Sequence, residues 1–184
     1  MQGLIIVRAF LSPTVALLLP FLLGSAAFAD EPAMAPAAAC TAPVAPTGEL
    51  APWSSPTALN AAGDDAGLRA ANLPVAQAAK VTLLSTPQVK YPLRPEKPGG
   101  SVSYGGLVGV DIAQAGTYRV ALSSGAWIDL VKQGKAATSV AHGHGPDCTG
   151  VRKMVDFALT PGRYTLQLGA NGDAQITVLV ARLP

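Results

Sequence analysis

The chain has 184 residues, of which 49% are hydrophobic and 13% are charged, and its 13 basic and 11 acidic side chains leave a formal net charge of +2. This near balance argues against a nucleic acid or an anionic membrane surface as the partner, because both require a concentrated basic face. The length allows one domain with a buried core and a tail.

Residues 1–29 have the organisation of a cleavable secretory signal peptide. Arg8 precedes an apolar run, and Ala27 and Ala29 supply the small side chains that signal peptidase accepts before its cleavage point. The apolar run is too short, and too often interrupted by prolines, to form a membrane-spanning helix, which needs about 20 residues. We therefore expect a periplasmic or secreted protein without stable membrane insertion after cleavage. The alternative is that residues 1–29 remain attached as an uncleaved membrane anchor.

Residues 30–79 are rich in alanine and proline and are expected to form an extension ahead of the domain. Proline fixes φ and removes a hydrogen-bond donor, so the stretch suits a tail or an extended wrapper. Trp53 and Cys40 are its residues with an evident reason to dock. Cys148 is the second mature cysteine, and in an oxidising compartment the pair predicts one disulfide, contributing about 4–5 kcal/mol in the chain-entropy treatment. Lipidation of Cys40 is the alternative.

Residues 80–184 contain short strand-like runs separated by glycine, proline and asparagine, which predicts an all-β, antiparallel β-sandwich of jelly-roll type. The last two runs alternate apolar and polar residues around Asn171-Gly172, which favours a terminal hairpin. The expected strands are 81–84, 89–91, 107–112, 117–122, 126–131, 139–141, 155–159, 164–168 and 174–181.

Two of these segments repeat one pattern. Residues 116–122 and 162–168 both follow the order Gly, any, Tyr, any, apolar, any, Leu. Equivalent strand entries in two facing sheets would produce this similarity.

Residues 115–120, 127–130 and 159–166 resemble bacterial pre-peptidase C-terminal domains, over roughly residues 101–183. The resemblance implies a small jelly-roll-like sandwich of the kind attached to secreted enzymes, and it implies a structural role for Asp129 at a strand edge.

The whole chain is also similar to a set of small exported proteobacterial proteins, through residues 94–106 and 141–148. Some of these proteins are labelled homogentisate 1,2-dioxygenase. That label implies an oxygen-using enzyme with an iron site of two histidines and a carboxylate.

Segment 141–148 contains both histidines of the protein, His142 and His144, followed by Asp147 and Cys148. In a strand, two side chains separated by one residue point to the same side. Imidazole, carboxylate and thiolate groups bind iron, copper or zinc. The segment predicts either a transition-metal site or a glycine-rich surface loop held by the disulfide, which would withdraw Cys148 from ligation.

A catalytic metal would need about three protein ligands. Asp129 or Asp111 would supply the missing carboxylate if the strands converge there. Without such convergence, no cofactor is expected.

Trp127, Asp129 and Lys153 are the remaining candidate binding residues. A tryptophan beside an acid can stack on a sugar or an aromatic ligand, although packing in the core is the alternative. Lys153 belongs to a charged patch with Arg152 and Asp156, for which a local ion pair is the simpler interpretation.

The sequence contains no G-x-S-x-G, H-E-x-x-H or phosphate-binding loop. Two hypotheses follow. The first is an exported, non-catalytic binding or accessory protein whose partner is a small molecule or a protein. The alternative is a small metal-binding protein or oxygen-using metalloenzyme with ligands in residues 142–148.

Overall fold

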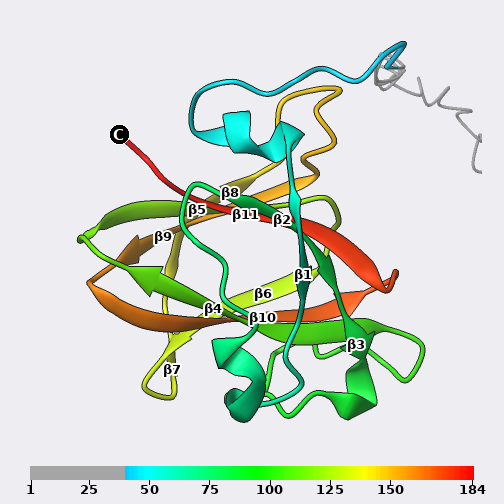
Figure 1. Ribbon diagram of the computed structural model, residues 1–184, viewed down its shortest axis with the longest axis vertical. Coiled ribbons are helices and arrows are strands. Elements are labelled where there is room, and N and C mark those ends of the chain that lie inside the picture. The colour runs from blue at the N-terminus through cyan, green and yellow to red at the C-terminus, as the bar shows by residue number, and fades with distance from the viewer. Residues whose placement is uncertain (1–39) are drawn as a thin grey trace, which may run out of the picture. The chain divides into compact units, whose positions relative to one another are not determined.

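The strands expected from alternating apolar residues form two sheets packed face to face (Figure 1). The structure is a computed structural model, and it describes residues 40–184. The expected signal peptide lies outside the described residues. Within the described part of the chain, no helix is long and apolar enough to cross a membrane.

Sheet A has six strands in the order β1-β2-β11-β5-β9-β8, and sheet B has five in the order β3-β4-β10-β6-β7. Neighbouring strands are antiparallel except β1 and β2, which run parallel. The all-β sandwich is therefore confirmed, and its jelly-roll type stays a prediction. The strands are β1 (Thr57–Asn60), β2 (Ala78–Thr82), β3 (Leu84–Ser85), β4 (Tyr104–Ile112), β5 (Gly116–Leu122), β6 (Trp127–Lys132), β7 (Lys135–Ala136), β8 (Ser139–Gly143), β9 (Lys153–Leu159), β10 (Gly162–Asn171) and β11 (Gln175–Arg182).

The core lies between the sheets because each long strand buries every second side chain there. Burial of an aliphatic side chain of this size contributes about 1.5–3 kcal/mol. The fully buried members of this core include Val108, Val110, Val120, Leu122, Leu130, Leu166, Leu168, Val178 and Val180.

The expected terminal hairpin is wrong. β10 pairs with β4 and β6 in sheet B, whereas β11 pairs with β2 and β5 in sheet A. Residues 172–174 therefore connect the two sheets, and the buried Asn171 fixes this crossing because its Nδ2 donates to the carbonyls of Asp173 at 2.6 Å and Gln175 at 3.3 Å. Alternation shows that a strand buries one face, but it does not show which strand supplies the hydrogen bonds.

The repeated tyrosine pattern is explained as expected. Its two copies enter β5 and β10, which belong to facing sheets. In each copy the buried tyrosine donates from Oη to the carbonyl four residues earlier. Tyr118 reaches Gln114 at 2.9 Å, and Tyr164 reaches Thr160 at 3.1 Å.

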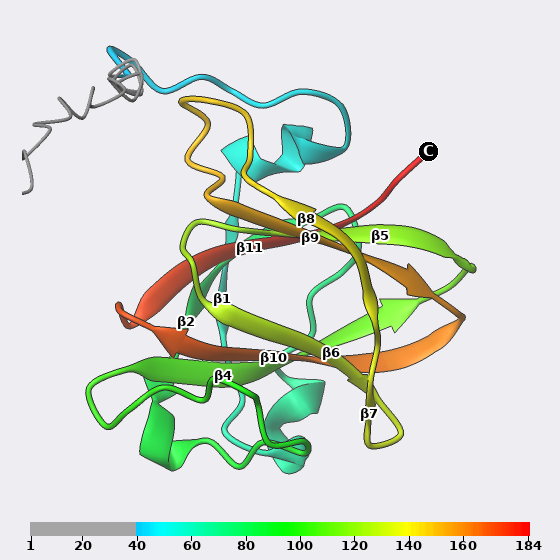
Figure 2. The ribbon, with the colours of Figure 1, turned by 180° about the vertical axis from the view of Figure 1, so that it is seen from behind.

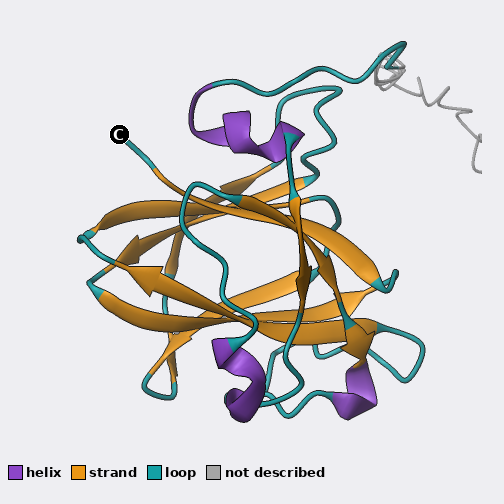
Figure 3. Cartoon of the chain, viewed as in Figure 1, coloured by secondary structure: helices purple, strands orange, loops and turns teal. Residues whose placement is uncertain are grey.

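Three short helical segments lie on the outer sides of the sandwich (Figure 3). They are η1 (Gly48–Ser54), η2 (Asp65–Arg69) and η3 (Thr86–Gln88). The segment 89–91, expected as a strand, follows η3 as irregular chain. Pro87 stands inside the three residues of η3, which accounts for the break.

The part of the extension that the structure describes, 40–79, is integrated into the sandwich. β1 joins the edge of sheet A, and Leu50 and Trp53 of η1 pack on the outer face of that sheet against Leu179 and Ala181. This stretch and the later strands form one compact unit. Trp53 was expected to dock, whereas the other apolar residues of this stretch, spaced without a clear period, gave no signal of this packing.

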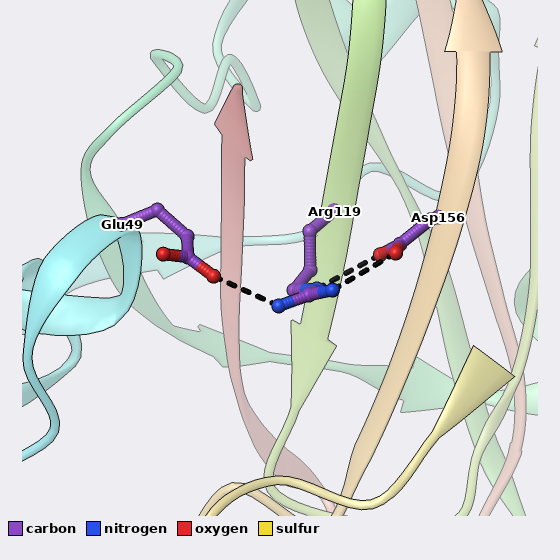
Figure 4. Close-up of polar contacts among 3 residues, drawn as sticks. All are labelled: Glu49, Arg119 and Asp156. Carbon is purple, nitrogen blue, oxygen red and sulfur yellow. Dashed lines mark hydrogen bonds and ion pairs between the residues drawn. The ribbon is translucent and has the colours of Figure 1, made fainter. Parts of the chain in front are cut away.

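An ion cluster fastens η1 to sheet A (Figure 4). Arg119 of β5 donates from Nε and Nη2 to both carboxylate oxygens of Asp156 of β9, at 2.8 and 2.9 Å, and from Nη1 to Glu49 at 2.8 Å. The hydrogen bonds to Asp156 are the main reason why the pKa of Arg119 is raised above its ordinary value. A planar guanidinium suits this two-sided arrangement.

Candidate functional site

Trp127, Asp129 and Lys153, the three expected binding residues, line one pocket of about 380 Å³. We call it the edge pocket. β6 supplies Trp127 and Asp129 from sheet B, and β9 supplies Lys153 from sheet A. Figure 2 shows these two strands. Its complete lining is Trp127, Ile128, Asp129, Ala137, Ser139, His142, Lys153, Val155 and Phe157.

The edge pocket exists because β6 has an incomplete neighbour on its outer side. β7 pairs only with Val131 and Lys132, and the carbonyl of Leu130 accepts from the N–H of Ala137 at 2.7 Å. Backbone groups alternate in direction along a strand, so the N–H and C=O of Ile128 face the same outer edge as those of Leu130. No described strand pairs there, and the gap leads to the core side chains Val155 and Phe157.

Lys153 bridges this gap between the sheets. Its Nζ donates to the carbonyl of Ala126 at 2.8 Å and lies 5.9 Å from the centroid of the Trp127 ring. Partial burial lowers the pKa of Lys153, and the positive charge of Lys97 lowers it further, while Asp129 opposes both effects. Lys153 is therefore an ammonium held in a partly desolvated place, where an added negative charge would stabilise it.

The Trp127 indole is held by its neighbours. Its Nε1 donates to Oδ2 of Asp129 at 3.0 Å, and the same oxygen lies 3.4 Å from Nε2 of Gln167. Gln167 is fully buried and bonds both backbone groups of Leu93, at 2.9 and 3.0 Å. Lys97 places its Nζ 5.7 Å from the ring centroid of Trp127. These bonds give the indole one orientation at the pocket wall.

Gln167 and Lys97 were missed at the sequence level. Gln167 alternates with apolar residues as a solvent-facing strand position would, and it is buried only because the chain around Leu93 covers the outer face of sheet B. Lys97 sits in an irregular segment, where no periodicity indicates what it approaches.

A second pocket of about 340 Å³ adjoins the first and shares His142 and Lys153 with it. We call it the basic pocket. Its lining is Gly125, His142, Gly143, His144, Arg152, Lys153 and Met154. No acidic side chain lines it, whereas two cations and two imidazoles do.

The structure brings the expected metal ligands together only in part. His142 and His144 line the basic pocket, and Nδ1 of His144 donates to the carbonyl of Arg152 at 3.0 Å. Asp147 is exposed and lines neither pocket, while Cys148 is bonded to Cys40. Among residues 40–184, no group of three or more His, Cys, Asp or Glu side chains is placed to hold a metal ion.

The two carboxylates considered as a third ligand have other partners. Asp129 accepts from Trp127 in the edge pocket, and Asp111 on β4 pairs with Arg163 at 3.0 Å. Asp129 shares the lining of the edge pocket with His142, but no group of three such ligands forms among residues 40–184.

The loop between β8 and β9, residues 144–152, is pinned from outside. The Cys40–Cys148 disulfide, predicted from the sequence, is present with a Cα–Cα distance of 5.4 Å. Trp53 donates from Nε1 to the carbonyl of Thr149 at 3.1 Å. At Gly145, a Cβ would collide with the side chain and the carbonyl oxygen of Val151, so this close approach requires glycine. The loop therefore holds His144 and Arg152 beside the basic pocket.

Comparison of the chain with known protein families finds no match, and comparison with curated proteins finds no similar sequence.

Proposed function

We propose that this protein is an exported, non-catalytic binding module that holds a small molecule in the edge pocket. The observation that carries the proposal is the convergence of Trp127, Asp129 and Lys153 around an apolar floor. Small-molecule sites are concave, mostly apolar and equipped with a few convergent polar groups. Trp127, Asp129 and Lys153 supply such polar groups at the open side of the sandwich, and the core does not require them for its packing.

The hydrogen bonds in the pocket support binding over catalysis. Asp129 accepts from Trp127 and Gln167, and Lys153 donates to Ala126. These bonds fix the direction of both side chains and leave further lone pairs on Asp129 and further N–H groups on Lys153 to orient a ligand. A general acid or base, in contrast, must exchange its proton with the substrate.

Export is supported by the disulfide, since such bonds persist in oxidising compartments. A periplasmic or secreted location agrees with the signal-like residues 1–29, which lie outside the described chain. The similarity to pre-peptidase C-terminal domains agrees with an accessory role.

Nuclear magnetic resonance of the two indole N–H groups tests the proposal. The probe is 2-naphthamide, a neutral compound with an apolar body. We expect its addition to shift the Trp127 signal saturably and to leave Trp53 unmoved, because Trp53 is buried under the β8–β9 loop. A Trp53→Phe variant assigns the two signals.

A variant that fills the pocket supplies the control. Ser139→Phe places a ring at the rim of the edge pocket, whereas Thr138→Phe adds the same ring at an exposed neighbour outside that lining. Binding should be lost in the first variant and kept in the second. Absence of a saturable Trp127 shift in the unaltered protein, or equal binding by both variants, would overturn the proposal.

A further inference from the structure

The basic pocket is a concentration of positive charge in a chain that is otherwise nearly neutral. Arg152 and Lys153 are consecutive, His142 and His144 lie beside them, and no carboxylate lines the same hollow. An anion in this hollow would be attracted to the two cations, Arg152 and Lys153, and the attraction is strongest at Lys153, which is partly buried.

Lys153 joins the two pockets. It lines both, it approaches the Trp127 ring, and partial burial and Lys97 lower its pKa. A negative group placed beside Lys153 in the basic pocket would therefore leave the rest of its molecule next to the apolar floor of the edge pocket.

The edge pocket itself is less suited to the anion. Asp129 lies within it and its carboxylate repels another negative charge. The apolar part of a ligand has no such conflict there, since Ile128, Val155 and Phe157 form the floor. The two pockets thus differ in the chemistry that each accepts.

From this division we infer that the ligand is a small organic acid, with its carboxylate in the basic pocket on Arg152 and Lys153 and its apolar body in the edge pocket against Trp127. The inference rests on the proposed function and adds the class of ligand. A guanidinium and an ammonium provide charge-assisted hydrogen bonds to carboxylate oxygens, and Arg152 can do so with two parallel N–H groups.

The experiment compares 2-naphthoate with 2-naphthamide, which share an apolar body and differ in charge. Titrations follow the Trp127 indole signal in the whole protein. We expect 2-naphthoate to bind about tenfold more tightly, and we expect this preference to shrink at high salt because exposed charges are screened.

Three variants locate the preference. Arg152→Gln and Lys153→Gln each remove one positive charge, and glutamine at 153 retains a donor for the Ala126 carbonyl. Lys80→Gln removes the same charge from an exposed position on β2, four strands away from β8 in sheet A. The preference for 2-naphthoate should fall about threefold or more in the first two variants and remain in the third.

The outcomes separate the inference from the function on which it rests. Equal binding of both probes would overturn the organic-acid inference and leave the binding module standing. Loss of binding to both probes would overturn the two proposals together. A preference that persists in Arg152→Gln and Lys153→Gln, or that falls equally in Lys80→Gln, would show steering by net charge and overturn the assigned subsite.

Discussion

Removal of the Arg119 guanidinium should destabilise the fold far more than removal of its outer partner. Asp156 is the inner partner, with a side chain that is only 9% exposed, and both of its oxygens accept from Arg119. In an Arg119→Met variant this carboxylate would stay nearly buried without its charge partner. Breaking a buried pair in that way costs about 3–5 kcal/mol. The 22% exposure of Arg119 lets some water reach the site, so we expect about 2–3 kcal/mol.

Glu49 provides the matched comparison. Its side chain is 28% exposed and accepts one bond from Arg119. A Glu49→Gln variant keeps an oxygen for that bond and removes a partly screened charge, so the expected loss is about 0.5 kcal/mol. The double variant Arg119→Met/Asp156→Leu removes both inner charges and should recover part of the loss from Arg119→Met.

Urea unfolding measures these differences as shifts of the midpoint at constant slope. Equal losses in Arg119→Met and Glu49→Gln would refute the reasoning, because they would show that water compensates Asp156 as fully as it does Glu49. A double variant less stable than Arg119→Met would also refute it, since the unpaired carboxylate would then not be the source of the loss.

Three further predictions concern the loop and the pockets. Denatured, non-reduced protein should contain no titratable thiol, and two reactive thiols would contradict the disulfide. A Cys40→Ser/Cys148→Ser variant should lose about 4–5 kcal/mol on urea unfolding, because the disulfide spans 108 residues. Between the lowered pKa of Lys153 in the folded protein and the ordinary lysine value of 10.5, the unfolded chain binds more protons at this group than the folded chain does. The free energy of unfolding should therefore increase as the pH rises through this range, and the increase should be absent in Lys153→Gln and present in Lys80→Gln. Identical pH profiles for the two variants would exclude this effect. After loading with zinc, iron or copper, elemental analysis should find less than one metal ion per chain, because His142 and His144 lack a third ligand among the described residues. Stoichiometric metal that disappears in the His142→Ala/His144→Ala variant would favour the metalloprotein hypothesis instead.

Several features of the site could be predicted from sequence because they depend on local chemistry. Trp127 and Asp129 lie two residues apart on a strand, so their side chains share a face, and the indole N–H meets the carboxylate at 3.0 Å. The disulfide could be predicted from the count of cysteines together with the expectation of an oxidising compartment. Lys153 was selected for its charge, but its role in both pockets depends on the approach of β9 to β6.

The sequence by itself determined the all-β class and the positions of most strands, and it supplied the candidate binding residues. These follow from period-two burial and from side-chain type, which are properties of short segments. The tertiary structure alone decided that β10 and β11 separate into different sheets and that residues 40–79 join the sandwich. It alone left β6 without a full neighbour, so that a tryptophan and a lysine from opposite sheets face one hollow. Strand pairing and sheet closure depend on contacts between distant segments, and one strand's pattern carries no record of its partner.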